Sequence, residues 1–533
     1  MGTDAVQLFD WDELNFAELA REMNATGAGL QPTINYEPFH EKPPLFIWLQ
    51  AVSTSLLGST AAAARLVNLL CGVVSFVCLW YLGRAHFQVG KAIWWPLCLA
   101  GSLLPALYFQ SGIIDPWFNL FILLGLWRSL TQPRMTPGQI ALSGLLLGLA
   151  VLTKGPAAGL IAGLCWLSLL VLRPADRWAR AGQYLAVGLL SLLPALVWLT
   201  LLWRVDGGHF AREFLDYQLR LFFQEDAGHG GFPGYHVVVL LLGCFPAAWL
   251  GLASLWGRFG SAQPAQRESD RGMRVLFWVV LLLFSVVNTK IIHYSSLCYF
   301  PLAWFAARAL TRDGYRGQWG RAINIGLTTT WGLYALASLA LPCLIWYLGG
   351  DDFSALAFDP ELQSRLRLNV RWPWFTLLPA LVAAAGLAWQ LRSRKRYDLN
   401  YPAHRQAWAA GHLALSSLFL AAGLSCFAPR IQRYTQGAPA AFFAGLAEEE
   451  VTVGTAYYKS YAHWYYAALP PGRYGGGCQD RQCRFHGPNR LPLYFASPMR
   501  VTEQVLREVP DAELLYQSGG FSFYRRPPVE EGG

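Results

Sequence analysis

Residues 137–172 read PGQIALSGLLLGLAVLTKGPAAGLIAGLCWLSLLVL, and Lys154 is the only charged residue among them. Two apolar blocks, 137–153 and 157–172, flank this lysine and the Gly155-Pro156 pair that follows it. Each block approaches the roughly 20 residues that cross a bilayer as a helix. A segment inside lipid must satisfy its own backbone hydrogen bonds, which favours helices. The pattern therefore predicts a helical hairpin in a membrane.

The same pattern extends in both directions along the chain. Hydrophobic residues make up 54% of the sequence, charged residues only 14%, and the mean hydropathy is +0.29. A soluble protein of this size carries about 25% charged residues. We therefore predict a polytopic α-helical membrane protein with twelve apolar spans, at 61–86, 90–108, 114–131, 137–153, 157–172, 182–204, 236–256, 273–288, 294–310, 321–347, 373–392 and 411–428.

Basic residues alternate between the loops that join these spans. One set of loops holds 20 lysines and arginines, and the alternate set, including residues 1–60, holds nine. Cytoplasmic loops of membrane proteins carry the excess of positive charge. The sequence therefore predicts that residues 1–60, the loop 205–235 and the C-terminal segment lie outside the cytosol, which in a bacterial inner membrane is the periplasmic side. The net charge of +9 lies in these short loops, so no nucleic-acid partner is expected.

Three parts are expected along the chain. Residues 1–60 contain an amphipathic helix, Asn15 to Met23, and a short apolar helix, Leu45 to Leu57, expected at the membrane interface. Residues 61–430 form the membrane domain. Residues 440–533 read as a small α/β domain, with strands near 451–458 and 492–496, a helix after Ser497-Pro498, and a closing hairpin at 514–525.

Charged and polar residues suited to chemistry gather on the predicted periplasmic side. An ionisable residue at the mouth of a span is a functional candidate, and Asp115 has no charged neighbour in its own segment. The candidate set comprises Asp12, Glu13, Glu41, Lys42, Asp115, Lys154, Arg220, His229, Tyr235, Lys290, His293 and Tyr294.

This mixture suits sugar transfer from a lipid phosphate. The leaving phosphate needs fixed cations or a metal, which Lys42, Arg220 and Lys290 could supply. A divalent Zn, Mg or Mn held by Glu41 and His229 could add to them. The acceptor needs a general base, and a carboxylate such as Asp12 fits. The apolar tail of the carrier needs a groove within the membrane.

The segments that carry these residues also resemble a known family. They read FDWDELNFAELAREM at 9–23, FHEKPPL at 39–45, IDP at 114–116, TKGP at 153–156, GHGG at 228–231 and KIIHY at 290–294. In this order they are similar to the bacterial relatives of protein O-mannosyltransferases, which include the lipid A aminoarabinose transferases. These enzymes are C-type glycosyltransferases, and the resemblance covers nearly the whole chain.

The resemblance implies a role for each matching residue. Asp12 would be the catalytic acidic residue, with Glu13 beside it and Asp115 as the second carboxylate. Lys42 and Arg220 would hold the phosphate of the carrier, with Tyr294 nearby. Their charge and their place on the same face add Lys154 and Lys290 to the residues expected to bind the carrier. Glu41 and His229 would match metal ligands. The donor would be a polyprenyl (undecaprenyl) phosphate sugar, transfer would be inverting, and the acceptor would be a lipid, a glycan or a protein.

The chain also departs from the family pattern. Members have thirteen spans, the first ahead of the acidic motif, so the resemblance implies one further span before Asp12. The aminoarabinose branch carries an arginine three residues after its catalytic aspartate, where this chain has Asn15.

Two other classes of function remain open from the residues. A flippase or transporter for lipid-linked sugars would place charges near mid-span and break its helices in pairs. An assembly protein would act through its C-terminal domain, where the sequence shows no catalytic constellation.

Overall fold

Two short helices begin the fold and pack against each other. The computed structural model describes residues 6–88, 90–174, 176–223, 231–257, 264–315, 318–348, 359–471, 485 and 490–528. Helix α1 (Asp12–Thr26) buries Phe16, Leu19, Ala20 and Met23, the face predicted from the sequence, against α2 (Leu45–Leu57). A small antiparallel hairpin, β1 (Thr33–Ile34) and β2 (Glu37–Pro38), which the sequence did not predict, joins them.

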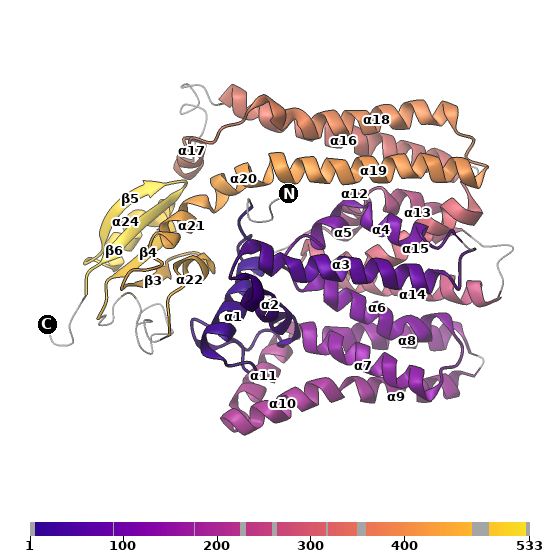
Figure 1. The fold of residues 1–533 in the computed structure, drawn as a ribbon, viewed down its shortest axis with the longest axis horizontal. Helices are drawn as coiled ribbons and strands as arrows, with labels where there is room; N and C mark the ends of the chain where they lie inside the picture. Colours follow the sequence, from indigo (N-terminus) through magenta and orange to yellow (C-terminus); the bar gives the residue numbers. More distant parts are fainter. Residues whose placement is uncertain are drawn as a thin grey trace.

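Long helices running in nearly one direction form the body of the molecule (Figure 1). Six described helices or helix pairs are long and apolar enough to cross a membrane: α3 (Ala61–Gly83), α7 (Pro137–Lys154), α9 with α10 (Arg177–Ser191 and Leu193–Asp206), α16 (Gln318–Leu348), α18 (Leu378–Arg396) and α19 (Pro402–Cys426). A seventh span results if α12 (Tyr235–Gly243) and α13 (Ala247–Trp256), bent by 118° at Pro246, are counted as one.

The remaining helices of the body are shorter or interrupted. Its helices are α4 (Trp94–Ala100), α5 (Leu103–Tyr108), α6 (Asp115–Thr131), α8 (Ala157–Leu172), α11 (His209–Phe223), α14 (Pro264–Val286) and α15 (Tyr299–Arg308), with a 3-10 helix η2 (Ile292–Cys298) and a π-helical turn η3 (Ala309–Asp313). Every predicted span coincides with helix, but the count of twelve is not confirmed. Part of the reason is local: the chain breaks at Gly101-Ser102 and at Pro246, and α6, α8 and α15 have only 17, 16 and 10 residues.

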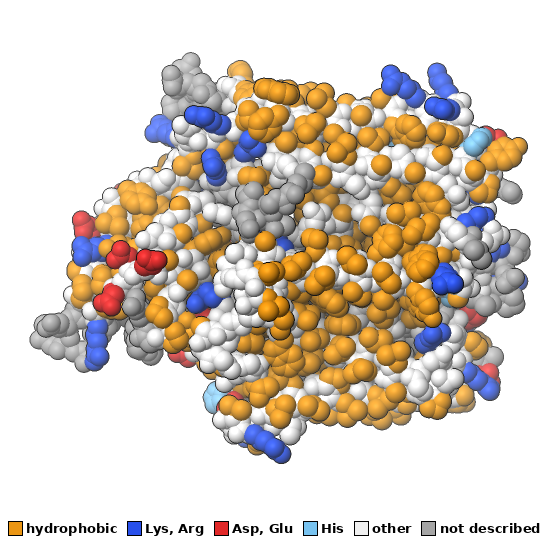
Figure 2. Space-filling view, viewed as in Figure 1, with side chains coloured by type: hydrophobic (Ala, Val, Ile, Leu, Met, Phe, Trp, Pro, Cys, Tyr) orange, Lys and Arg blue, Asp and Glu red, His pale blue; other side chains and the backbone are white. Residues whose placement is uncertain are grey.

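The outer surface of this bundle is apolar, as a lipid-facing surface must be. Val77 of α3, Val171 of α8 and Leu336 of α16 expose 53%, 71% and 66% of their surface. Figure 2 shows a broad hydrophobic band between lysine and arginine side chains at its two ends. The protein is thus a multi-pass membrane protein.

A small mixed sheet lies at one end of the bundle, beside α1 and α2 (Figure 1). Its order is β3-β4-β6-β5, with β3 parallel to β4 and the other pairs antiparallel. The predicted hairpin is confirmed as β5 and β6, whereas Ser497 lies in a strand and the helix begins after it. The elements of this end are α17 (Pro360–Leu366), η5 (Trp374–Leu377), α20 (Ala428–Thr435), α21 (Gly437–Ala444), β3 (Thr452–Thr455), α22 (Ala462–Ala467), β4 (Leu493–Pro498), η6 (Met499–Val501), α24 (Thr502–Glu508), β5 (Glu513–Ser518) and β6 (Phe521–Arg526).

Candidate active site

A cavity of about 500 Å³ lies at the end of the bundle that carries α1 and the sheet. Segments distant in sequence form its wall: the start of α1, residues 41–42, the facing ends of α6 and α7, residues 290–294, and the segment before α22. Its described lining residues are Trp11, Asp12, Asn15, Phe16, Glu41, Lys42, Ile114, Asp115, Lys154, Tyr235, Lys290, Ile291, Ile292, His293, Tyr294, Lys459 and Tyr461. Most of the candidates predicted from the sequence therefore meet in one place.

Asp12 presents the most accessible carboxylate of this cavity. It is the first residue of α1, where the helix dipole favours a negative charge, and its side chain is 54% exposed. Its Oδ2 lies 3.9 Å from Nδ1 of His293. Burial lowers the pKa of His293, and Lys154 and Lys42 act in the same direction, against the carboxylates of Asp115 and Asp12. The imidazole is therefore held neutral beside Asp12 over a wider pH range than a free histidine.

Asp115 and Lys154 form a buried ion pair in the wall of the cavity. Nζ of Lys154 donates to Oδ1 of Asp115 at 2.6 Å. The pair forms because Asp115 begins α6, Lys154 ends α7, and the two helices pack side by side in opposite directions. The same ammonium lies 5.7 Å from the ring centres of Phe118 and Tyr294. The sequence predicted both charges but not their pairing.

The C-terminal segment contributes a cation that the sequence analysis missed. Nζ of Lys459 lies 3.9 Å from Oε1 of Glu41, and its ammonium also lies against the rings of Trp11 and Tyr461 at 5.4 and 5.7 Å. One feature of the sequence could have marked Lys459 as a candidate: it is the only lysine after residue 440.

Asp10 holds this segment against the start of α1. Its Oδ1 accepts the backbone N–H of Tyr461 at 2.9 Å, and its Oδ2 pairs with the Ser460 hydroxyl. Gln432 and Gln436 donate to the carbonyls of Gln7 and Leu8, both at 2.6 Å. The position of Lys459 therefore depends on contacts between the N-terminal residues 7–10 and the segment 432–461.

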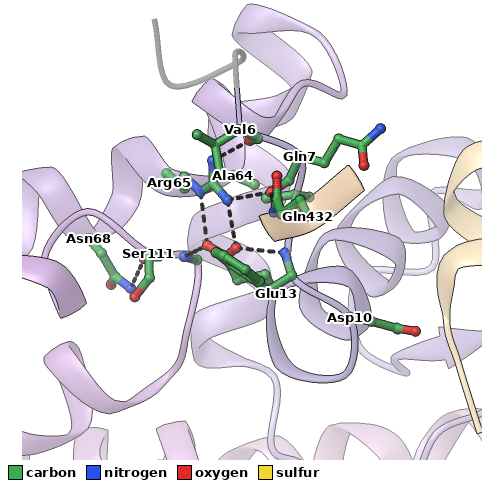
Figure 3. A network of polar contacts seen from close by, with 12 residues as sticks. Val6, Gln7, Asp10, Glu13, Ala64, Arg65, Asn68, Ser111 and Gln432 are labelled. Carbon is green, nitrogen blue, oxygen red and sulfur yellow. Dashed lines mark hydrogen bonds and ion pairs between the residues drawn. The ribbon is translucent and has the colours of Figure 1, made fainter. Parts of the chain in front are cut away.

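Glu13 is not among the described residues that line the cavity, and it holds the residues before α1 in place through a network of polar contacts (Figure 3). Its carboxylate accepts hydrogen bonds from Nε and Nη2 of Arg65 at 2.9 and 2.7 Å, and from the backbone N–H groups of Phe9 and Gly112. Arg65, buried in α3, also donates to the carbonyls of Val6 and Gln7. The structure does not bring Glu13 to the other catalytic candidates. Arg65, which the sequence analysis passed over, positions the residues just before Asp12.

Lys290 lies with the other candidates at the cavity, whereas Arg220 does not. Lys290 lines the cavity, but its Nζ donates to the carbonyls of Phe284, Ser285 and Val287 at the end of α14. This arrangement caps the helix and favours a cation there. Arg220 is exposed on α11, with its guanidinium 5.9 Å from the ring centre of Tyr217, and it is not among the described residues that line the cavity.

The predicted metal site is not assembled by the part of the chain that the structure describes. His229 lies outside the described residues. Glu41 faces the ammonium of Lys459, and no group of three histidine, cysteine or acidic side chains close enough to hold an ion occurs in the described ranges.

Sequence and structure comparisons identify similar proteins. Residues 41–200 match the family described as dolichyl-phosphate-mannose-protein mannosyltransferase. The chain is 30% identical to undecaprenyl phosphate-alpha-4-amino-4-deoxy-L-arabinose arabinosyl transferase 1 of Sodalis glossinidius over 63% of its own length, and it spans 61% of that relative. It is 25% identical to the transferase of the corresponding name from Edwardsiella ictaluri, covering 78% of this chain and 80% of the relative.

Solved structures agree on the fold. The chain superposes on ArnT from Cupriavidus metallidurans in the apo state with a TM-score of 0.71, at 19% identity, over 98% of this chain and 94% of that one. The same protein bound to undecaprenyl phosphate also gives 0.71, at 18% identity, with equal coverage. The resemblance predicted from the sequence is confirmed. In fold and in sequence the chain resembles the membrane-embedded C-type glycosyltransferases of the protein O-mannosyltransferase and aminoarabinose transferase group.

Proposed function

We propose that this protein transfers a sugar from a polyprenyl phosphate carrier to an acceptor at the periplasmic face of a bacterial inner membrane. One observation carries the proposal: the accessible Asp12 carboxylate shares a cavity with the lysines 42, 154 and 459, at a membrane surface. That combination of a base and fixed cations suits attack on a sugar whose leaving group is a phosphate.

The proposed reaction is a single displacement. An acceptor oxygen attacks the anomeric carbon of the sugar as the bond from that carbon to the phosphate oxygen breaks. The electron pair of that bond leaves with the polyprenyl phosphate, and a hydroxyl acceptor gives its proton to Asp12. Because one displacement occurs, the configuration at the anomeric carbon inverts.

The cations of the cavity would stabilise the leaving phosphate. Lys42 and Lys459 line the cavity, and Tyr294 adds a polar ring beside Lys154. Lys154 is paired with Asp115, so the two charges offset each other in the cavity wall. A bound phosphate would compete with Asp115 for the Lys154 ammonium. We assign Glu13 and Lys290 to holding the backbone around the site.

The proposal gives the three parts of the chain distinct tasks. Residues 1–60 would supply Asp12, Glu41 and Lys42. Residues 61–430 would provide the membrane groove for the carrier. Residues 440–533 would close the cavity with Lys459 from the periplasmic side. The low count of basic residues in the loops at this end supports that orientation.

The relatives reported above carry transferase names, which supports transfer over flipping of a lipid-linked sugar. Those names also suggest the first donor to test, undecaprenyl phosphate aminoarabinose. The acceptor classes to test are lipid A, other envelope glycans and protein. Asn15 lines the cavity one helical turn from Asp12, so it is placed to contact a donor or acceptor.

The experiment compares Asp12→Asn with Asp216→Asn, an exposed aspartate of α11 outside the cavity lining. Envelope lipids, glycans and proteins of cells with and without the gene are compared by mass spectrometry to find the product. We expect Asp12→Asn to abolish product formation while the purified variant still binds polyprenyl phosphate, and Asp216→Asn to behave as the parent. Full product formation by Asp12→Asn would overturn the proposal.

A further inference from the structure

A second cavity, of about 560 Å³, opens between α8 and α14, away from the candidate active site. Its wall consists of two residues of α8 and one face of α14. Successive lining positions on α14 are three residues apart or adjacent, the spacing of one helix face. The lining residues are Ser168, Leu172, Arg267, Asp270, Arg271, Arg274, Val275, Trp278, Val279 and Leu282.

This face of α14 changes character along the helix axis. Its first turns present Arg267, Arg271 and Arg274, and the following turns present only apolar side chains as far as Leu282. From Arg267 to Leu282 the helix rises by about 22 Å, at 1.5 Å per residue. Leu172 of α8 and Leu282 expose 53% and 57% of their surface. The cavity is thus an open groove, basic at one end and apolar along its length.

Positive charge exceeds negative charge at the basic end. Glu268 pairs with Arg173 at 2.7 Å and with Arg271 at 3.1 Å. Asp270 is buried against Arg308 at 2.8 Å and accepts from the Trp304 indole. Among the described residues that line or pair at this end, five are arginines (Arg173, Arg267, Arg271, Arg274 and Arg308) and two are carboxylates (Glu268 and Asp270), so arginines outnumber carboxylates there.

The groove lies at the membrane face opposite the candidate active site. Lys290, which lines the active-site cavity, caps the last turn of α14, whereas the arginines lie in its first turns. Nineteen residues of helix separate Arg267 from Val286, or roughly 28 Å, close to the thickness of the hydrocarbon core of a bilayer. The basic end thus lies on the side of the arginine-rich loops.

We propose that this groove binds one anionic phospholipid of the leaflet on the side of the basic loops. The phosphate headgroup would lie against Arg267 and Arg271, and an acyl chain would follow α14 past Val275 and Val279, against Leu172. A phospholipid has the same order of charge and apolar surface as the groove. Basic pockets between membrane helices select anionic headgroups because one guanidinium group can donate two parallel hydrogen bonds to the oxygens of a phosphate.

The test titrates the purified full-length protein with phosphatidylglycerol and separately with phosphatidylcholine, and counts bound lipids by native mass spectrometry. We expect one phosphatidylglycerol to bind at least about tenfold more tightly than phosphatidylcholine, and Arg267→Gln/Arg271→Gln to remove that preference. The matched control, Arg134→Gln/Arg177→Gln, removes two exposed charges, one from the loop before α7 and one from the start of α9, and should keep that preference.

A second variant tests the apolar part of the groove without changing any charge. Val279→Trp should fill the space beside Trp278 and weaken the binding of both lipids. The proposal would be overturned if the parent bound the two lipids equally. It would also be overturned if Arg267→Gln/Arg271→Gln kept the preference for phosphatidylglycerol, or if the control lost that preference to the same extent. Unchanged lipid binding by Val279→Trp would overturn the placement of the acyl chain. Thermal unfolding of each variant verifies that it is folded.

Discussion

Glu13 and Asp12 are neighbouring carboxylates, and the structure predicts opposite consequences for removing their charges. Glu13 is 2% exposed and Arg65 is 4% exposed. Glu13→Gln would leave the guanidinium of Arg65 buried without its counter-charge, which typically costs 3–5 kcal/mol, so we expect a loss of about 4 kcal/mol. The Asp12 side chain is 54% exposed, and within the described residues its charged partner is His293 at 3.9 Å, so Asp12→Asn should change stability by about 0.5 kcal/mol or less.

A double-mutant cycle separates the ion pair from other effects of the changes. Glu13→Gln, Arg65→Met and the double variant are unfolded in detergent by titration with a denaturing detergent and followed by tryptophan fluorescence. The double variant should be less destabilised than the sum of the singles, with a coupling energy of about 2–3 kcal/mol. Glu13→Gln should lower activity only to the extent that the loss of the Glu13 contacts displaces Asp12 at the start of α1.

Two results would refute this reasoning. If Glu13→Gln unfolds at the same denaturant concentration as the parent, the carboxylate is not the anchor that its four hydrogen bonds indicate. If Asp12→Asn is destabilised as much as Glu13→Gln, the two neighbours do not differ in role.

Three other perturbations test the cavity and its surroundings. Asp115→Asn should destabilise the protein by about 3–5 kcal/mol because the Lys154 ammonium would remain partly buried, and Asp115→Asn/Lys154→Met should cost less than the single change, as measured by the same unfolding titration. Lys459→Gln should weaken the binding of polyprenyl phosphate roughly tenfold in a fluorescence titration, because a charge-assisted contact is lost. Burial and the neighbouring Glu18 raise the pKa of Glu22 to about 8, so Glu22→Gln should raise the thermal midpoint at pH 8.5 and change it little at pH 5.

The sign of the last prediction follows from proton binding. In the unfolded chain Glu22 titrates near pH 4.3. Between that pH and about 8 the folded protein holds more protons than the unfolded chain, so stability is full below the unfolded pKa and falls as pH rises. Glutamine cannot ionise and removes this loss. Parallel pH profiles for the parent and Glu22→Gln would contradict the assignment.

Matched variants serve as controls for the other two. Lys395→Gln removes an exposed charge at the far end of α18 and should leave binding of the carrier unchanged. If Lys395→Gln and Lys459→Gln weakened carrier binding equally, the loss would reflect long-range attraction between a positive protein and the phosphate, and not a contact made by Lys459. For the ion pair, an Asp115→Asn/Lys154→Met variant less stable than Asp115→Asn would contradict the account.

Much of the secondary structure of this protein could be predicted from local sequence patterns. The long apolar blocks, the alternation of basic loops, the buried face of α1 and the hairpin of β5 and β6 all depend on residues close together in the chain. Hydrophobic periodicity and turn residues report such structure directly. The same pattern overestimated how many blocks form one straight span, because Gly101-Ser102 and Pro246 bend the chain inside apolar segments.

The sequence by itself predicted a helical membrane protein and named most of the residues that line the candidate active-site cavity. Only the tertiary structure decided which charges meet there. Asp115 faces Lys154, Glu13 faces Arg65, and Lys459 reaches Glu41 from a distant segment. These partners are separated by 39, 52 and 418 residues. Which of many possible partners a buried charge meets depends on how whole helices pack, and no local periodicity carries that information.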